Sequence, residues 1–210
     1  MLTHQQDAQL SAPAISPDPR RTLARAVTEL FAPAAVVAVL LGAVAWHTAR
    51  TTADALLWGT IAVAFAAVVP FVYIVYGVRK RRLTDHHVRV REQRRLPLLV
   101  GMVSVLIGFA LIALGGAQRE LVALVGAMVV GLATSGLVTL FWKISIHVAV
   151  AAGALVILVL VFGSTLLVLA PLVILIGWAR VAVDDHTPAQ VVAGAALGGA
   201  VAGAIFPLLR

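Results

Sequence analysis

Long apolar runs separated by short polar segments dominate the chain from about residue 30 onward. The runs cover about residues 30–47, 55–78, 96–114, 121–141, 148–179 and 190–209. An α-helix rises 1.5 Å per residue and the hydrocarbon core of a bilayer is about 30 Å thick, so each run is long enough to form a membrane-spanning helix. The pattern therefore predicts an all-α fold, a polytopic membrane bundle of six to seven transmembrane helices.

The run at residues 148–179 leaves the number of crossings open, because it is long and holds no charged residue. As one helix it would measure about 48 Å, well beyond the thickness of the hydrocarbon core. The small residues Gly163-Ser164-Thr165 near its middle are a natural break, and we expect a hairpin of two spans there. A single crossing is the alternative, and it would place His147 and His186 on opposite sides of the membrane.

The residues before the first run lack hydrophobic periodicity. Residues 1–21 contain Gln, Ser, Asp and several prolines, a composition typical of disorder. We expect residues 1–28 to form a disordered cytoplasmic tail. Residues 29–210 then form the transmembrane bundle, with a basic loop at residues 79–95.

The composition excludes a water-soluble protein and several kinds of site. Of 210 residues, 61% are hydrophobic and only 12% are charged, which is typical of a polytopic membrane protein. The chain has no cysteine, which excludes disulfides, thiolate catalysis and cysteine-based metal centres. The net charge of +7 does not indicate nucleic acid as a partner, because the basic residues flank the apolar runs and no nucleic-acid-binding motif accompanies them.

The lysines and arginines are divided unequally between the two ends of the predicted helices. With seven crossings, thirteen of the 16 lie on the side of the amino terminus, and three lie on the other side. The thirteen are Arg20, Arg21, Arg25, Arg79, Lys80, Arg81, Arg82, Arg89, Arg91, Arg94, Arg95, Lys143 and Arg180. Basic residues in short loops favour the cytoplasmic side. We therefore expect an integral protein of the plasma (inner) membrane with its functional polar segments on the cytoplasmic face.

The segment at residues 180–194 carries charge where charge is otherwise scarce. Arg180, Asp184, Asp185 and His186 lie there between two apolar runs. Ionisable residues at a membrane boundary are costly, and they indicate function. Either aspartate could hold one ring nitrogen of His186 and so fix the tautomer of the imidazole.

The same segment predicts the start of a helix. Thr187 can be the N-cap, Pro188 the first helical residue and Gln190 the partner that closes a capping box. His186 then lies just ahead of a helix N-terminus. The unpaired N–H groups and the dipole of a helix N-terminus attract anions such as phosphate.

The predicted cytoplasmic face gathers the groups that phosphoryl transfer requires. His147 and His186 each stand at the start of a membrane helix, while Lys143, Arg180 and the basic loop supply cations. Phosphoryl transfer needs a nucleophile, a proton donor for the leaving oxygen and fixed positive charge near the phosphate oxygens. Histidine can act both as the nucleophile and as the proton donor.

The order of residues in this part of the chain resembles the signatures of the type 2 phosphatidic acid phosphatase superfamily. The spacing Arg180-x5-His186-x3-Gln190 is similar to the third signature, Ser-Arg-x5-His-x3-Asp. The sequence Ile-Ser-Ile-His at residues 144–147 is similar to the second, Pro-Ser-Gly-His.

The basic loop is similar in place to the first signature of that superfamily, Lys-x6-Arg-Pro. His87-x6-Arg94-Arg95 fits it best, and Arg82-x6-Arg89 also fits. With the first signature included, the resemblance spans about residues 79–199, which is more than half of the chain.

The resemblance implies a role for each matching residue. His186 would be the nucleophile that forms a phosphohistidine, and His147 the acid that protonates the leaving alkoxide. The phosphate oxygens would be bound by Arg94, Lys143, Ser145 and Arg180. The resemblance implies no metal and no other cofactor.

Three residues depart from the superfamily signatures. Gln190 replaces the carboxylate that orients the nucleophile, so either Asp185 or Asp184 takes that role as a further catalytic residue or the rate is reduced. Ile146 replaces a glycine whose backbone approaches phosphate closely, and His87 replaces a lysine. These departures leave a catalytically degenerate member open as the alternative to an enzyme.

The sequence therefore favours a membrane-embedded, metal-independent lipid phosphatase. Its substrate would be a phosphomonoester or diphosphate with a hydrophobic tail, either polyprenyl or similar to phosphatidic acid. The alternatives are the degenerate member, acting as a non-enzymatic binding or structural protein, and a transporter. The spans are nearly free of ionisable residues, which argues against a transporter, because transporters place such residues near the bilayer midplane.

The last apolar run is rich in glycine. Gly194, Gly198, Gly199 and Gly203 form two small-xxx-small pairs, which allow two helices to pack closely in lipid. The partners that we expect are the lipid phosphate substrate and the bilayer, and association into a homo-oligomer is left open.

Overall fold

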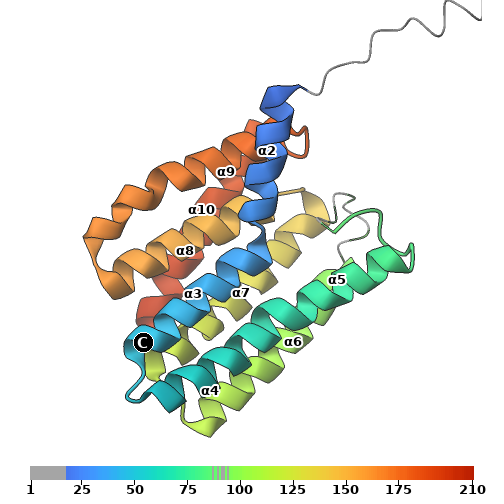
Figure 1. Cartoon of the computed structure of the whole chain (residues 1–210). Helices are drawn as coiled ribbons and strands as arrows, with labels where there is room; N and C mark the ends of the chain where they lie inside the picture. Colours follow the sequence, from blue (N-terminus) through green and yellow to red (C-terminus); the bar gives the residue numbers. More distant parts are fainter. Residues whose placement is uncertain (1–17, 87, 89, 91–92, 94) are drawn as a thin grey trace, which may run out of the picture.

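The computed structural model describes residues 18–86, 88, 90, 93 and 95–210, and the described chain is helical with no strand. Figure 1 shows the helices gathered into one bundle. In chain order they are α2 (Pro19–Leu30), α3 (Pro33–Thr48), α4 (Thr52–Val63), the π-helical turn η1 (Ala64–Val68), α5 (Val69–Arg79), α6 (Arg95–Gly115), α7 (Arg119–Phe141), α8 (Ile146–Phe162), the 3₁₀ helix η3 (Ser164–Leu169), α9 (Ala170–Ala182) and α10 (Pro188–Leu209).

Five helical stretches in the described part of the chain are long and apolar enough to cross a membrane, and the count reaches six if the bent pair α2 and α3 forms one span. The pair bends by 42°. Helix α8 is also apolar but has only 17 residues. The expected all-α membrane bundle is confirmed, and helices α3 to α10 lie on the apolar runs of the sequence.

The amino-terminal boundary differs from the expectation. Residues 19–28 belong to helix α2, so the disordered tail that we predicted up to residue 28 is wrong for this stretch. Asp18 caps the helix by accepting a hydrogen bond from the backbone N–H of Arg20 at 3.0 Å, and Pro19 occupies the first turn. Ala24 and Val27 are buried against the bundle. Helix α2 forms because tertiary packing covers this narrow apolar stripe, which the surrounding arginines obscure in the sequence.

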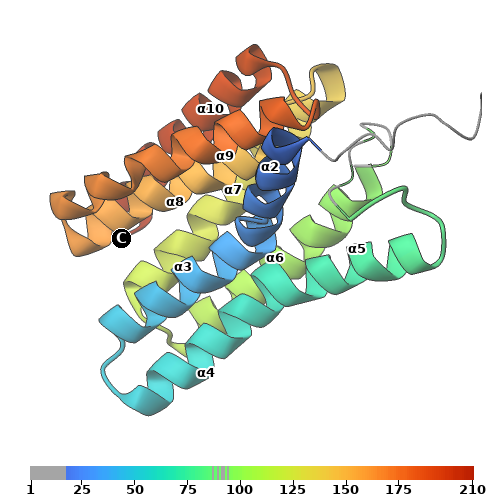
Figure 2. The ribbon, with the colours of Figure 1, turned by 45° about the horizontal axis from the view of Figure 1, so that its top comes forward.

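The charge-free run divides at Gly163, as the hairpin interpretation predicted. Gly163 has a φ of +103°, a backbone conformation that glycine adopts without steric cost. Helix α8 ends there, and η3 with α9 returns alongside it (Figures 1 and 2). The return brings the start of α8 and the end of α9 to the same end of the bundle.

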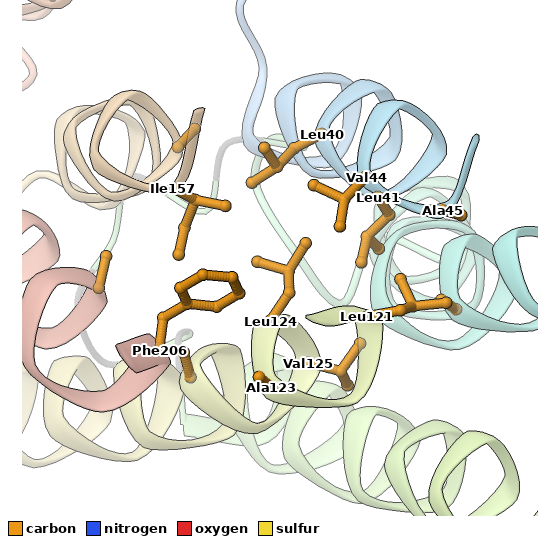
Figure 3. Packing of buried hydrophobic residues seen from close by; sticks show 14 of the residues in the cluster. Leu40, Leu41, Val44, Ala45, Leu121, Ala123, Leu124, Val125, Ile157 and Phe206 are labelled. Atoms are coloured by element: carbon orange, nitrogen blue, oxygen red, sulfur yellow. The ribbon is translucent and has the colours of Figure 1, made fainter. Parts of the chain in front are cut away.

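The centre of the bundle is a cluster of buried aliphatic side chains around Phe206 of α10. Figure 3 shows that the side chains of α3, α7, α8 and α10 meet there. The cluster includes Leu41 and Val44 of α3, Leu121 and Leu124 of α7, and Ile157 of α8. A smaller second cluster, formed by Ala24, Val27, Val148, Ala151, Ile176 and Ala179, fixes α2 to α8 and α9.

Helices α8 and α10 approach each other through glycine. A Cβ on Gly198 would lie 1.9 Å from the carbonyl oxygen of Ala149, and one on Gly194 would lie 2.5 Å from that of Ser145. Both positions therefore require glycine if the helices are to keep this separation. The predicted small-xxx-small pair Gly194–Gly198 packs against α8 within the same chain.

Candidate functional site

A tight turn joins α9 to α10 and carries His186. Asp184 adopts a left-handed conformation with φ of +58°. The backbone N–H groups of Asp185 and His186 both donate to the carbonyl oxygen of Arg180, at 3.2 Å each. The turn thereby satisfies a carbonyl at the end of α9 and holds both buried residues against the bundle.

The capping box predicted at the start of α10 is confirmed. The side chain of Thr187 accepts from the backbone N–H of Gln190 at 3.4 Å, and the amide oxygen of Gln190 accepts from the backbone N–H of Thr187 at 3.2 Å. Pro188 occupies the first helical turn. His186 therefore lies immediately before the N-terminus of α10.

Gln190 also contacts the imidazole of His186. Its Oε1 lies 3.1 Å from Nδ1 of His186. An amide oxygen only accepts hydrogen bonds, so this contact favours the tautomer with hydrogen on Nδ1 and a lone pair on Nε2. We expected Asp185 or Asp184 to orient the ring, but the structure places the amide of Gln190 at Nδ1.

The two aspartates contact arginines. Oδ2 of Asp185 lies 2.7 Å from Nη2 of Arg180, and the two side chains are only 5% and 1% exposed. Asp184 is exposed and forms an ion pair with Arg21 of α2. Burying two charges costs desolvation energy, and the attraction between them repays that cost only when the geometry of the pair is good. The buried pair of Arg180 and Asp185 therefore favours one defined geometry of the two side chains.

Lys143 reaches the same turn from the segment between α7 and α8. Its Nζ donates to the backbone carbonyl of Asp185 at 2.6 Å. The backbone N–H of Ser145 donates to the carbonyl of Gln190 at 3.2 Å, a second link between the two segments. Lys143 and Ser145 therefore lie beside the turn that carries His186, as the sequence analysis expected.

His147 and Ser145 begin helix α8. Ser145 is the N-cap and is fully buried, and its Oγ has no hydrogen-bond partner among the described residues. The side chain of His147 is buried as well. An N-cap hydroxyl beside the first N–H groups of a helix is suited to binding an anion.

A cavity of about 330 Å³ joins the two histidines. His147 and His186 both line it, and so does His86 from the loop after α5. Most of the other lining residues are aliphatic and come from α3, α5, α6, α7, α8 and α10. An apolar cavity with a few convergent polar groups is typical of a site for a small or elongated apolar ligand.

Two of the sequence expectations lie outside the described residues. They concern Arg94, the expected phosphate ligand of the basic loop, and His87, which we aligned with it. In the alternative alignment, Arg89 also lies outside the described residues, and Arg82 is exposed.

The sequence analysis missed a contact that joins α2 to the loop. Nε2 of His86 lies 3.1 Å from both carboxylate oxygens of Glu29. The two residues are 57 positions apart, and no local motif contains them both. No signal in the sequence could have paired them.

The arrangement places a candidate nucleophile and a candidate proton donor at one cavity, with two cationic side chains beside the turn that carries the nucleophile. His186 has an oriented ring, His147 lies at the same cavity, and Arg180 and Lys143 flank the turn. In the described part of the chain, no group of three His, Asp or Glu side chains is placed to hold a metal ion. These groups can perform phosphoryl transfer by nucleophilic and acid–base catalysis.

The comparison with protein families agrees with this chemistry. Residues 139–210 match the PAP2 superfamily, the phosphatidic acid phosphatase type 2 group that the signatures resemble. The match covers about a third of the chain and includes every expected site residue except Arg94. Neither a curated protein nor a solved structure matches the chain.

Proposed function

We propose that this membrane protein is a lipid phosphatase that works through a phosphohistidine on His186. The observation that carries the proposal is that His147 and His186, from two different helix starts, line one cavity that is otherwise mostly apolar. The match of residues 139–210 to the PAP2 superfamily supports hydrolysis of a phosphate ester as the reaction.

In the proposed reaction, Nε2 of His186 attacks the phosphorus and the bond from phosphorus to the lipid oxygen breaks. His147 donates a proton to that oxygen as the alcohol leaves. Gln190 holds the Nδ1–H of His186 throughout. A water activated by His147 then attacks the phosphohistidine, which releases inorganic phosphate and restores both histidines.

The phosphate oxygens would be held by groups near the turn. Arg180 and Lys143 supply positive charge, Ser145 supplies a hydroxyl, and Arg94 of the basic loop completes the set that we expect. Arg180 is held by Asp185 and Lys143 by the carbonyl of the same residue. Cations fixed in this way need little reorganisation as negative charge develops on the transferring phosphoryl group.

The substrate that we infer has a hydrophobic tail on its phosphate. The tail would occupy the cavity, whose walls are mostly aliphatic, while the headgroup reaches the histidines at its polar end. Polyprenyl phosphates or diphosphates and lipids similar to phosphatidic acid both fit this description. The proposed reaction uses no metal or other cofactor.

We further propose that the site faces the cytoplasm from the plasma (inner) membrane. The proposal rests on the excess of Lys and Arg on the side of the amino terminus. A topology reporter fused after Trp142 should report a cytoplasmic location. An extracytoplasmic signal would reverse the assignment.

The experiment that tests the proposed function is phosphate release by the purified protein. In detergent micelles with farnesyl phosphate or dioleoyl phosphatidic acid, we expect inorganic phosphate to be released at the same rate with and without EDTA. A protein that releases no phosphate from either lipid would favour the degenerate, non-enzymatic alternative, which the replacement of a carboxylate by Gln190 keeps open.

We expect the rate of phosphate release to be higher with a carboxylate at position 190 than with the amide of Gln190. Gln190→Glu keeps the length of the side chain and its place in the capping box, and it adds negative charge beside the imidazolium of the phosphohistidine. Charge-assisted hydrogen bonds are roughly twice as strong as neutral ones, so we expect kcat to rise about tenfold. Steady-state phosphate release measures the change.

The matched control for this substitution is Gln190→Met, which is similar in size but offers Nδ1 no comparable acceptor. We expect kcat to fall about tenfold in this variant, because the ring of His186 loses its orientation. Equal rates in both variants and the wild type would contradict an orienting role for Gln190.

A further inference from the structure

Helix α2 lies outside the region that matches the PAP2 superfamily, yet it contacts two segments whose histidines line the cavity. Arg21 near its start pairs with Asp184 of the turn that carries His186. Glu29 near its end pairs with His86, which lines the cavity. Figure 2 shows α2 beside α9, near the α9–α10 connection.

These contacts fix which way α2 faces. Arg21, Arg25 and Glu29 are spaced four residues apart, so they form one stripe along the helix. Ala24 and Val27, on another face, are buried in the second hydrophobic cluster. The stripe therefore runs from the catalytic turn at one end to the cavity wall at the other.

Arg25 occupies the middle of the stripe. At 1.5 Å per residue it lies about 6 Å along the helix axis from each of the two anchoring residues. Its side chain is exposed and makes no ion pair or hydrogen bond with the described residues, whereas Arg21 and Glu29 are both engaged. The chain just beyond α2 also lines the cavity, at Ala32 and Pro33.

We infer that Arg25 binds the anionic phosphate headgroup of the substrate at the mouth of the cavity. The inference rests on the proposed function and adds a binding residue that no superfamily signature contains. A guanidinium presents a fork of N–H donors that matches phosphate oxygens in pairs. Its position between the turn and the loop lets it hold the headgroup while His186 reaches the phosphorus.

The test compares two arginines of the same helix. Arg25→Gln should raise KM for farnesyl phosphate about tenfold and leave kcat within about twofold, because the lost contact binds the ground state and the transition state equally. Arg20→Gln is the matched control. It removes the same charge, but Arg20 lies about 140° around the helix from Arg25, so both constants should stay unchanged.

Inhibition by inorganic phosphate shows whether Arg25 contacts the phosphate itself. Under the inference, the inhibition constant for inorganic phosphate rises in Arg25→Gln together with KM, because the phosphate that Arg25 holds in the substrate is the one that is released. An unchanged inhibition constant beside a raised KM would assign Arg25 to the lipid tail and overturn the inference. Equal kinetics in Arg25→Gln and Arg20→Gln would also overturn it, as would a loss of kcat in place of the rise in KM.

If the purified protein has no phosphatase activity, the proposed function is rejected, but the role of Arg25 in binding can still be tested. In that case the affinity of the purified protein for farnesyl phosphate is measured by titration calorimetry. A Kd raised about tenfold in Arg25→Gln alone supports the inference. An equal Kd in both variants and the wild type rejects it.

Discussion

Replacing His186 by alanine should lower phosphate release by about 10⁴-fold or more, the scale of loss when a catalytic nucleophile is removed. The reason is that Gln190 orients the ring of His186 as the candidate nucleophile, whereas His147 and His86 line the cavity from other elements. Rates of release from farnesyl phosphate by wild type and variant measure the effect.

A labelling experiment shows whether the loss comes from the nucleophile. Quenching of the wild type in alkaline denaturant during turnover of ³²P-labelled lipid phosphate should trap a phosphoprotein that survives in alkali and loses its label in acid, and His186→Ala should trap none. Loss of His147 should instead slow phosphate release from lipid phosphates, whose leaving group is an alkoxide, far more than from p-nitrophenyl phosphate, whose leaving group needs no proton. A His186→Ala variant that works at the wild-type rate would refute the assignment.

Replacing Gly198 by alanine should lower both the activity and the stability of the protein, although Gly198 is not one of the candidate site residues. The added Cβ would lie 1.9 Å from the carbonyl oxygen of Ala149, so α8 and α10 must move apart. That movement loosens the backbone link from Ser145 to Gln190 and shifts His147 relative to His186. A misplacement of about 1 Å can cost about 100-fold in rate, and overpacking typically costs about 1–3 kcal/mol of stability.

The neighbouring residue offers a control for this prediction. A Cβ on Gly199 would make only an ordinary contact, 3.9 Å from a side-chain atom of Val156. We expect Gly199→Ala to keep both the activity and the melting temperature of the wild type in detergent, while Gly198→Ala loses about 100-fold in activity and melts several degrees lower. Equal behaviour of the two variants would show that the close contact of α8 and α10 does not position the site.

Several features could be predicted from short stretches of sequence. The apolar runs fixed where the helices lie, because each run needs its own length to cover a hydrocarbon core. The break at Gly163 followed from length and from small residues, and the cap of α10 followed from the pattern Thr-Pro-x-Gln. These signals are local, so the sequence alone carries them.

Other features depend on residues that are far apart in the chain. The amide of Gln190 lies at Nδ1 of His186, while the carboxylate of Asp185 lies against Arg180. The sequence showed which polar residues lie near His186 in the chain. It did not show which of them contacts the imidazole ring.

Residues 19–28 illustrate the same limit. The sequence predicted a disordered tail there, whereas the structure forms helix α2, with Ala24 and Val27 buried in a cluster with residues of α8 and α9. Glu29 meets His86 because the tertiary fold brings α2 beside the loop. The sequence by itself determined that this protein is a membrane bundle with two histidines at helix starts. Only the tertiary structure decided that both histidines line one cavity and which groups surround them, because contacts across the bundle depend on how whole helices pack and not on neighbours in the chain.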